Sequence, residues 1–397
     1  MIEAGTPSRA HFGLPAELRE RFHDGFCHSV LWPLMHGFGA RVRYSEDDWR
    51  AYVEVNELYA RHASQLADPD ATIWVHDFHL LLVARSLRAR GHRGRIGLFV
   101  HVPFPDRDIF YAMPRGNELA RAMLDFDLVG FQTRHFATNF LGCVRGKRLP
   151  QVEVFPVTID FEPYRPYPER LALPESPEVA GLRGALGDCR MILGVDRLDH
   201  SKGIPERLEA FDRLLERYPE WRRRVVLVQL SVPSRAELPD YAELRQRVET
   251  QVAQINERFG DASWVPVRYL VRSHGHDVLA QLYRLADVAL ITPLRDGMNL
   301  VAKEFVVAQR SESPGVLVLS QHAGAAETLN SALITNPFHR EGLAADLDHA
   351  LRMPQTERVR RHRMLASALE REGDAQVWAE RYLDRLMPRV SLERTGN

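Results

Sequence analysis

The chain has 397 residues, which is more than one hydrophobic core usually organises, and at about 150 residues per domain the length suggests two domains. Hydrophobic residues make up 45% and charged residues 26%, so the chain can bury sizeable cores and is not disordered overall. The 52 Lys and Arg residues balance 53 Asp and Glu residues, and a formal net charge of −1 offers no field that attracts nucleic acid nonspecifically. We therefore expect a globular protein that does not bind nucleic acid.

No stretch of the chain approaches the roughly 18 apolar residues of a membrane span, and MIEAGTPSRAHFG at the N-terminus lacks the features of a signal peptide. These observations predict a cytoplasmic protein without membrane contact. The cysteines Cys27, Cys143 and Cys189 are far apart and form no Cys-x-x-Cys pair. Reduced thiols are therefore favoured over a disulfide framework or a cysteine-built zinc site.

Short apolar, β-branched runs alternate with segments of helical period along most of the chain. In the first half, strands are predicted at 72–76, 96–101, 128–132 and 152–157, with helices near 80–90, 118–125 and 135–145. In the second half, strands are predicted at 191–195, 225–230, 267–271, 288–291, 316–319 and 332–334. This alternation is typical of parallel sheets covered by helices on both faces, so we predict two doubly wound α/β domains.

The segment 161–177, FEPYRPYPERLALPESP, is rich in proline and charge and has neither hydrophobic period, so we place the domain linker there. From residue 341 onward the pattern is wholly helical. We predict an N-terminal domain of residues 1–165, a C-terminal domain of residues 166–375, and a final helix of residues 376–397 that packs back towards the N-terminal domain. Facing open α/β domains bind ligands beyond the carboxyl ends of their strands, in the cleft between them.

The motif GVDRLDHSKG leaves one predicted strand and enters a helix whose first turn holds Pro205. It presents Arg197 and Lys202 beside a helix N-terminus, where free N–H groups and the helix dipole favour an anion. A phosphate or diphosphate fits this position. An equally weighted alternative is that both cations only pair with nearby carboxylates, which are Asp196, Asp199 and Glu206.

The motif TPLRDGMNLVAKE follows the predicted strand 288–291. Gly297 permits a close backbone approach, and a helix that starts near Asn299 aims its free amides at the cleft. Asp296 and Glu304 then bracket one ligand and could hold two sets of sugar hydroxyls on either side of a phosphate. The alternative, of similar weight, is that Asp296 only caps the helix.

The strand end WVHDFH carries His76, Asp77 and His79, and the next strand ends in HVPFP with His101. A metal site is disfavoured because adjacent positions at a strand end point in different directions. A substrate hydroxyl bound by Asp77 and another bound by His101 fit better. No G-x-G-x-x-G or Walker A motif follows a strand, which argues against dinucleotide oxidoreductases and P-loop kinases.

Eight ordered motifs together resemble the trehalose-6-phosphate synthase family, which are retaining glycosyltransferases of family 20 with the GT-B fold. The motifs are FCHSVLWP, WVHDFHLL, RIGLFVHVPFP, LVGFQT, GVDRLDHSKGIPERL, PSR, TPLRDGMNLVAKEF and GVLVLSQHAGAA. The resemblance runs from about Phe26 to the C-terminal helices. It implies two Rossmann-like domains, an interdomain cleft, a nucleotide diphosphate sugar donor and a phosphorylated sugar acceptor. It implies no metal and no cofactor besides the co-substrate, and it is compatible with a homo-oligomer.

The resemblance also assigns expected roles to residues. On the donor side, Arg197 and Lys202 would hold the diphosphate, Glu304 the ribose and Asp296 the hydroxyls of the transferred sugar. The diphosphate would also accept from backbone amides, which belong to Gly297, Met298, Asn299 and Leu300. The expected catalytic residues are Asp77, His101, Arg197, Lys202 and Asp296, with His101 near the reacting centre. The expected acceptor-binding residues are Asp77, Trp32, Arg235 and His23, the last at a position where the family has a tyrosine.

The family begins with an apolar strand, an Asn-Arg pair and a Gly-Gly loop that do not occur in this sequence, so we expect a shortened N-terminal sheet. This difference and His23 both affect the acceptor pocket, and three functions stay open. The first is a retaining glycosyltransferase that acts on glucose 6-phosphate or another phosphorylated acceptor. The second is a glycosyltransferase or pseudo-glycosyltransferase of specialised metabolism, with a cyclitol phosphate or a nucleotide as acceptor. The third is a non-catalytic nucleotide-sugar sensor or partner subunit.

Overall fold

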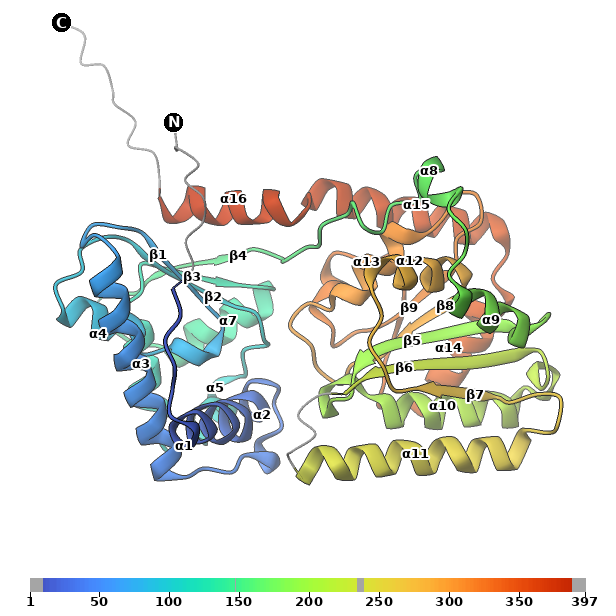
Figure 1. Ribbon diagram of the computed structural model, residues 1–397, viewed down its shortest axis with the longest axis horizontal. Coiled ribbons are helices and arrows are strands. Elements are labelled where there is room, and N and C mark those ends of the chain that lie inside the picture. The colour runs from blue at the N-terminus through green and yellow to red at the C-terminus, as the bar shows by residue number, and fades with distance from the viewer. Residues whose placement is uncertain (1–9, 147, 234–238, 388–397) are drawn as a thin grey trace, which may run out of the picture.

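The computed structural model describes residues 10–146, 148–233 and 239–387, and it forms two α/β domains side by side, each around its own sheet (Figure 1). The N-terminal sheet has four parallel strands in the order β1-β2-β3-β4. These strands are β1 (Ile73–His76), β2 (Ile96–Val100), β3 (Leu128–Phe131) and β4 (Gln151–Val154).

The C-terminal sheet has six parallel strands in the order β10-β9-β8-β5-β6-β7. They are β5 (Arg190–Arg197), β6 (Val225–Val232), β7 (Val267–Leu270), β8 (Val288–Ile291), β9 (Val316–Ser320) and β10 (Leu333–Thr335). The strand order reverses between β5 and β8, which is where open α/β sheets bind ligands. All ten predicted strands are present, and the prediction of two doubly wound domains is confirmed.

The helices of the N-terminal domain include the three predicted from the sequence, which are α4 (Val83–Ala89), α6 (Gly116–Met123) and α7 (Arg134–Cys143). The sequence did not predict the helical run before β1. It comprises α1 (Ala16–Arg19), a π-helix (Glu20–Leu31), α2 (Trp32–Met35) and α3 (Glu46–Leu66), and a short helix α5 (Arg107–Tyr111) follows β2. α2 continues directly from the π-helix, so an unusual helical winding decides which side chains face the cleft at this edge.

The helices of the C-terminal domain cover both faces of its sheet (Figure 1). They are α9 (Pro177–Leu186), α10 (Ile204–Arg217), α11 (Pro239–Phe259), α12 (His276–Leu285), α13 (Leu300–Ala308), α14 (Arg340–Arg352) and α15 (Gln355–Glu372). α10 begins after Gly203, which has a φ of 64°, and holds Pro205 in its first turn. The predicted linker contains a short helix, α8 (Pro168–Leu171). Each domain has its own cluster of buried apolar side chains.

The last described helix, α16 (Ala375–Leu386), leaves the C-terminal domain and packs on the N-terminal sheet (Figure 1). Tyr382 is fully buried, and its ring stacks on that of Trp74 with 4.4 Å between centroids. The indole Nε1 of Trp378 donates to the carbonyl oxygen of Phe155 at 3.1 Å. The exact residue limits of the three predicted domains stay a prediction. None of the described helices is both long and apolar enough to cross a membrane.

A buried lysine joins three segments where the two domains meet. Lys303, on α13, is 0% exposed, and its Nζ donates to the carbonyl oxygen of Val157 at 2.8 Å. The same Nζ lies 2.7 Å from Oε2 of Glu372, at the end of α15. Helix α13, the chain between the domains and the C-terminal helices are therefore joined through Lys303.

Candidate active site in the interdomain cleft

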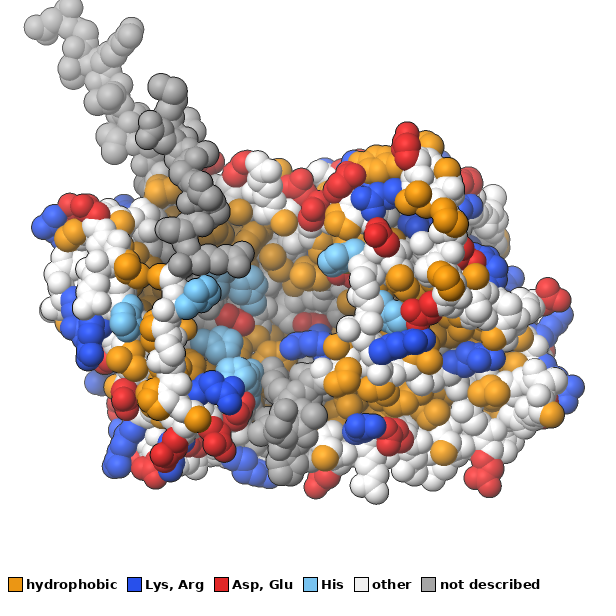
Figure 2. Space-filling view, in the orientation of Figure 1, with side chains coloured by type: hydrophobic (Ala, Val, Ile, Leu, Met, Phe, Trp, Pro, Cys, Tyr) orange, Lys and Arg blue, Asp and Glu red, His pale blue; other side chains and the backbone are white. Residues whose placement is uncertain are grey.

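The carboxyl ends of the two sheets meet across the cleft, where the loops after β2 and β8 touch through their backbones. A Cβ added to Gly297, after β8, would lie only 2.0 Å from the carbonyl oxygen of His101, after β2. Only glycine allows this approach without a shift of the backbone. On the face drawn in Figure 2, histidine side chains gather along the N-terminal side of the cleft. The loops after β2 and β8 therefore fix the distance between the domains.

Lys202 and Asp296 form an ion pair at the switch point of the C-terminal sheet. The Nζ of Lys202 lies 2.5 Å from Oδ2 of Asp296, and the side-chain Nδ2 of Asn299 donates to the same oxygen at 3.0 Å. Burial acts to raise the pKa of Asp296, but the Lys202 ammonium and the hydrogen bonds from both partners outweigh it, so the pKa lies below its usual value. Lys202 thus pairs with Asp296 and not with the nearby carboxylates of its own motif.

The helix cap in this loop is Asn299, not Asp296. Asn299 has a φ of 76°, and its Oδ1 accepts from the backbone N–H of Ala302 at 3.0 Å. The backbone N–H of Ala325 donates to the carbonyl oxygen of Met298 at 2.7 Å, which holds the loop against the end of β9. The carboxylate of Asp296 therefore stays available to Lys202 and to a ligand, beside the N-terminus of α13.

Arg197, the last residue of β5, meets the N-terminal domain through an aromatic ring. Its guanidinium carbon lies 5.6 Å from the ring centroid of Trp32, the first residue of α2. Within the described ranges Arg197 forms no ion pair. An arginine held by a ring face keeps its N–H groups available as donors to an anion.

Asp77 and His101 occupy the opposite wall, at the ends of β1 and β2. The backbone N–H of His101 donates to Oδ1 of Asp77 at 3.3 Å. Burial raises the pKa of Asp77 to about 6, although backbone hydrogen bonds and the charge of Arg197 act to lower it. Asp77 also has a φ of 66° and a ψ of −175°, a region almost restricted to glycine. The strained backbone and the buried carboxylate both cost stability, so the fold alone does not favour an aspartate at position 77.

His101 is neutral at physiological pH. Burial lowers its pKa to about 4, and the neighbouring His76 contributes to the shift. The Nε2 of His101 lies 3.1 Å from Nδ1 of His76. No group of three or more potential metal ligands occurs among the residues that the structure describes. The two histidines thus bond to each other at the cleft wall.

Glu304 lies on α13, eight positions after Asp296 in the chain. Its Oε2 accepts from the hydroxyl of Tyr283 at 2.7 Å. Burial and the charge of Glu304 raise the pKa of Tyr283 well above its usual value, so the tyrosine stays a donor. The hydrogen bond fixes the Glu304 carboxylate on α13, the helix that follows the loop of Asp296.

One buried histidine beside this site was not predicted from the sequence. His36 follows α2, and its ring packs at a tilt of 36° against that of Trp32, with 4.0 Å between ring centroids. Its Nδ1 lies 2.8 Å from the carbonyl oxygen of Trp32, which can only accept, so Nδ1 carries a proton. Burial lowers the pKa of His36 to about 4, despite the nearby charges of Asp199 and Asp296. No motif or period in MHGFG signals this placement.

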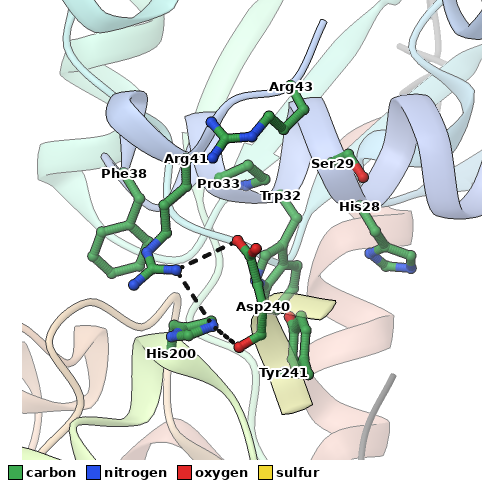
Figure 3. A pocket seen from close by; sticks show the side chains of 10 residues that line it. All are labelled: His28, Ser29, Trp32, Pro33, Phe38, Arg41, Arg43, His200, Asp240 and Tyr241. Carbon is green, nitrogen blue, oxygen red and sulfur yellow. Dashed lines mark hydrogen bonds and ion pairs between the residues drawn. The ribbon is translucent and has the colours of Figure 1, made fainter. Parts of the chain in front are cut away.

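The expected acceptor residues are only partly brought together. Trp32 lines a cavity of about 250 Å³ between the domains, which we call the Trp32 pocket (Figure 3). His23 is not among the lining residues, but its Nε2 lies 3.1 Å from Nε2 of His28, which does line the pocket. Arg235 lies outside the described residues. The ten residues that line the pocket are His28, Ser29, Trp32, Pro33, Phe38, Arg41, Arg43, His200, Asp240 and Tyr241.

Two doubly wound parallel sheets that face each other across a cleft, with cations and carboxylates at their strand ends, have the architecture of the GT-B glycosyltransferases. The sequence profile of Glycosyltransferase family 20 matches residues 7–387, and the chain belongs to this family. The trehalose-6-phosphate synthase of Cronobacter sakazakii is 40% identical over 390 residues, which cover 94% of this chain and 81% of that protein. The family and fold predicted from the sequence are confirmed.

Solved structures give the same result. The UDP-forming α,α-trehalose-phosphate synthase of Burkholderia vietnamiensis matches with a TM-score of 0.92 and 36% identity, over 95% of this chain and 84% of that chain. The Burkholderia xenovorans enzyme in complex with glucose-6-phosphate matches with a TM-score of 0.90 and 37% identity, over 94% and 85%. An E. coli structure described as trehalose-6-phosphate bound with UDP-2-fluoro glucose matches with a TM-score of 0.90 and 38% identity, over 94% and 85%.

Proposed function

We propose that this glycosyltransferase transfers glucose from UDP-glucose to glucose 6-phosphate, with retention of the anomeric configuration, to form trehalose 6-phosphate and UDP. The observation that carries the proposal is the placement of Arg197 and the Lys202–Asp296 pair opposite Asp77 and His101. Relatives whose structures hold glucose-6-phosphate and a UDP-glucose analogue support this choice of substrates.

On the donor side, Arg197 and Lys202 bind the diphosphate and stabilise the charge that develops as it leaves. Lys202 exchanges part of its contact with Asp296 for phosphate oxygens, and the Asp296 carboxylate then accepts from hydroxyls of the transferred sugar. The N-terminus of α13 supplies backbone donors in the same place. Glu304, held by Tyr283, accepts from the ribose hydroxyls.

On the acceptor side, the carboxylate of Asp77 accepts from a hydroxyl of the incoming sugar and neutral His101 hydrogen-bonds the transferred glucose. The bond between C1 and the diphosphate oxygen breaks, and the acceptor oxygen bonds to C1 on the same face. The acceptor proton passes to the departing phosphate oxygen. Catalysis then consists of positioning and charge stabilisation, with no protein nucleophile.

Two further properties belong to this proposal. Arg197 and Lys202 supply the positive charge that metal ions supply in other transferases, so we propose a metal-independent enzyme. Cys27, Cys143 and Cys189 are all free, which fits a reducing compartment, and we place the enzyme in the cytoplasm.

A turnover assay followed by mass spectrometry tests the proposal. UDP-, GDP- and ADP-glucose are offered separately with glucose 6-phosphate, and both the nucleotide released and any disaccharide phosphate are recorded. The proposal expects a disaccharide phosphate and equimolar UDP from UDP-glucose. Donor binding without product, followed by product with a cyclitol phosphate, would replace glucose 6-phosphate by that acceptor. Absence of both binding and product with all three donors would contradict a catalytic role.

A further inference from the structure

The Trp32 pocket is continuous with the proposed transfer site through one residue. The ring of Trp32 contacts the guanidinium of Arg197 at the transfer site, and the same side chain lines the pocket. The C-terminal domain contributes His200, Asp240 and Tyr241 to the opposite wall. A molecule bound to both regions would therefore extend from the donor phosphates into a space between the two domains.

Two arginines enter this pocket from the segment that follows α2. Figure 3 shows Arg41 between the domains, where its Nη1 lies 3.4 Å from Nε2 of His200 and 3.5 Å from Oδ2 of Asp240. Both distances are at the outer limit for such contacts. Arg43 forms no ion pair within the described part of the chain, and its Nη1 donates only to the carbonyl oxygen of Ala40 at 3.3 Å. Both guanidinium groups can therefore bind a stronger acceptor.

The backbone holds these arginines in place while their side chains stay exposed to solvent. The N–H of Arg43 donates to the carbonyl oxygen of Ser29 at 2.8 Å, and the N–H of Arg41 donates to that of Phe38 at 2.8 Å. Both residues are exposed, so neither is part of the hydrophobic core. Their positions are fixed by the backbone, whereas nothing in the packing of the domain requires their charge.

The other lining residues suit a sugar that carries an anion. Among the ten described residues that line the pocket, Asp240 is the one carboxylate against two arginines, so this described lining carries an excess of positive charge. Trp32, Phe38 and Tyr241 supply aromatic faces. Guanidinium groups bind phosphate through paired hydrogen bonds, and aromatic faces pack against apolar faces of a ligand.

We propose that Arg41 and Arg43 bind the anionic group of the acceptor and make the enzyme selective for phosphorylated over neutral sugars. This inference rests on the proposed function and adds two residues to the acceptor site. Arg41 exchanges its long contacts with His200 and Asp240 for the phosphate oxygens. Because those contacts cross the cleft, a phosphate bound by Arg41 lies between the N-terminal domain and the C-terminal segment that carries Asp240.

The test compares Arg41→Ala, Arg43→Ala and the double variant with Arg50→Ala as a matched control. Arg50 is an exposed arginine of α3 whose Nη1 contacts Asp47 at 3.4 Å, outside the pocket. Steady-state turnover of UDP-glucose is measured with glucose 6-phosphate and with glucose as acceptors. Calorimetry measures the Kd of UDP, and the Kd of glucose 6-phosphate for the UDP-saturated protein.

Each single substitution is expected to raise KM and Kd for glucose 6-phosphate about tenfold, the loss of one charge-assisted hydrogen bond. The double variant should lose most of the preference for glucose 6-phosphate over glucose. The Kd of UDP, the turnover of glucose and all values for Arg50→Ala should change less than about twofold, and Arg41→Lys should recover part of the loss. An unchanged preference in the double variant would overturn the inference, as would an equal loss with both acceptors.

The proposed function can fail separately from this inference. If the wild-type protein does not glycosylate glucose 6-phosphate, the proposed function is wrong whatever the variants do. Binding of glucose 6-phosphate to the UDP-saturated wild type, weakened in the double variant, would still support the pocket assignment. Absence of any binding by the wild type would overturn the assignment as well.

Discussion

Gly297 and His101 touch through their backbones across the cleft, with space for no side chain between them. A Cβ on Gly297 would lie 2.0 Å from the carbonyl oxygen of His101. Gly297 belongs to the loop that holds Asp296. His101 directly follows β2, and β2 pairs with β1, the strand that precedes Asp77. The contact therefore sets how closely the donor wall and the acceptor wall can approach.

Gly297→Ala is expected to lower kcat about 100-fold while the Kd of UDP changes only a few-fold. The added methyl group must displace one loop from the other, and a displacement of about 1 Å at reacting atoms can cost this much. The matched control is Gly275→Ala, since a Cβ at Gly275 meets nothing within 4 Å. Equal kcat values for Gly297→Ala and the wild type would contradict the role of this contact.

Removal of Lys202 should weaken donor binding more than removal of one cation normally does. Lys202→Ala leaves the Asp296 carboxylate without its partner and facing the donor diphosphate. We expect the Kd of UDP-glucose to rise about 100-fold in Lys202→Ala and to recover about tenfold in Lys202→Ala with Asp296→Asn. Calorimetry measures both values. If the second substitution brings no recovery, Asp296 does not face the phosphates.

Asp77 should reduce the stability of the folded protein at neutral pH. Its pKa rises from 3.8 to about 6 on folding, so the folded protein binds the proton more tightly. The Asp77 carboxyl therefore costs no stability below about pH 4, where it is protonated in both states, and the folded protein loses stability as the pH rises through about 6. Asp77→Asn should increase the free energy of unfolding by up to about 3 kcal/mol at pH 7.5 and by little at pH 4.

The same Asp77→Asn variant should lose most of its activity with glucose 6-phosphate, because a neutral amide oxygen is a weaker hydrogen-bond acceptor than a carboxylate. Denaturant titrations at the two pH values measure the stability difference, and Asp384→Asn on α16 is the surface control. A gain in stability that does not depend on pH would show that desolvation of the Asp77 carboxylate is not its cause.

Lys303 should be essential for stability through its ion pair with Glu372. Lys303→Ala leaves a carboxylate without its cation in a buried place, which costs about 3–5 kcal/mol. Lys303→Met combined with Glu372→Gln removes both charges and should be the more stable of the two variants. Because the chain has two domains, the midpoint of denaturant unfolding is the proper measure. The opposite order of midpoints would contradict the pairing.

The sequence predicted the sheets well because buried parallel strands leave a strong pattern. All ten strands follow from apolar runs bounded by turn residues, and a close backbone approach at Gly297 was expected, but the sequence did not show that His101 would be its partner. The partners of charged groups were harder to predict. The local motif offered three carboxylates for Lys202, but its partner is Asp296, which lies 94 residues later in the chain.

The N-terminal edge of the cleft was the least predictable part. Residues 20–31 form a π-helix, for which the helical period of 3.6 residues gives no signal. This winding precedes Trp32 and His36, and it puts His28 rather than His23 on the wall of the Trp32 pocket. A position matched by spacing alone therefore identifies the region of the acceptor site but not the side chain that faces it.

Transfer of glucose between two bound substrates, with retention, can be followed by proton NMR of the running reaction. With UDP-glucose and glucose 6-phosphate, we predict loss of the donor anomeric signal, equimolar UDP, and new signals from a disaccharide phosphate with two α-linked anomeric protons. Arg197→Ala should form the same product more slowly. Release of free glucose, a β-linked product, or an unchanged spectrum would contradict glucose transfer with retention.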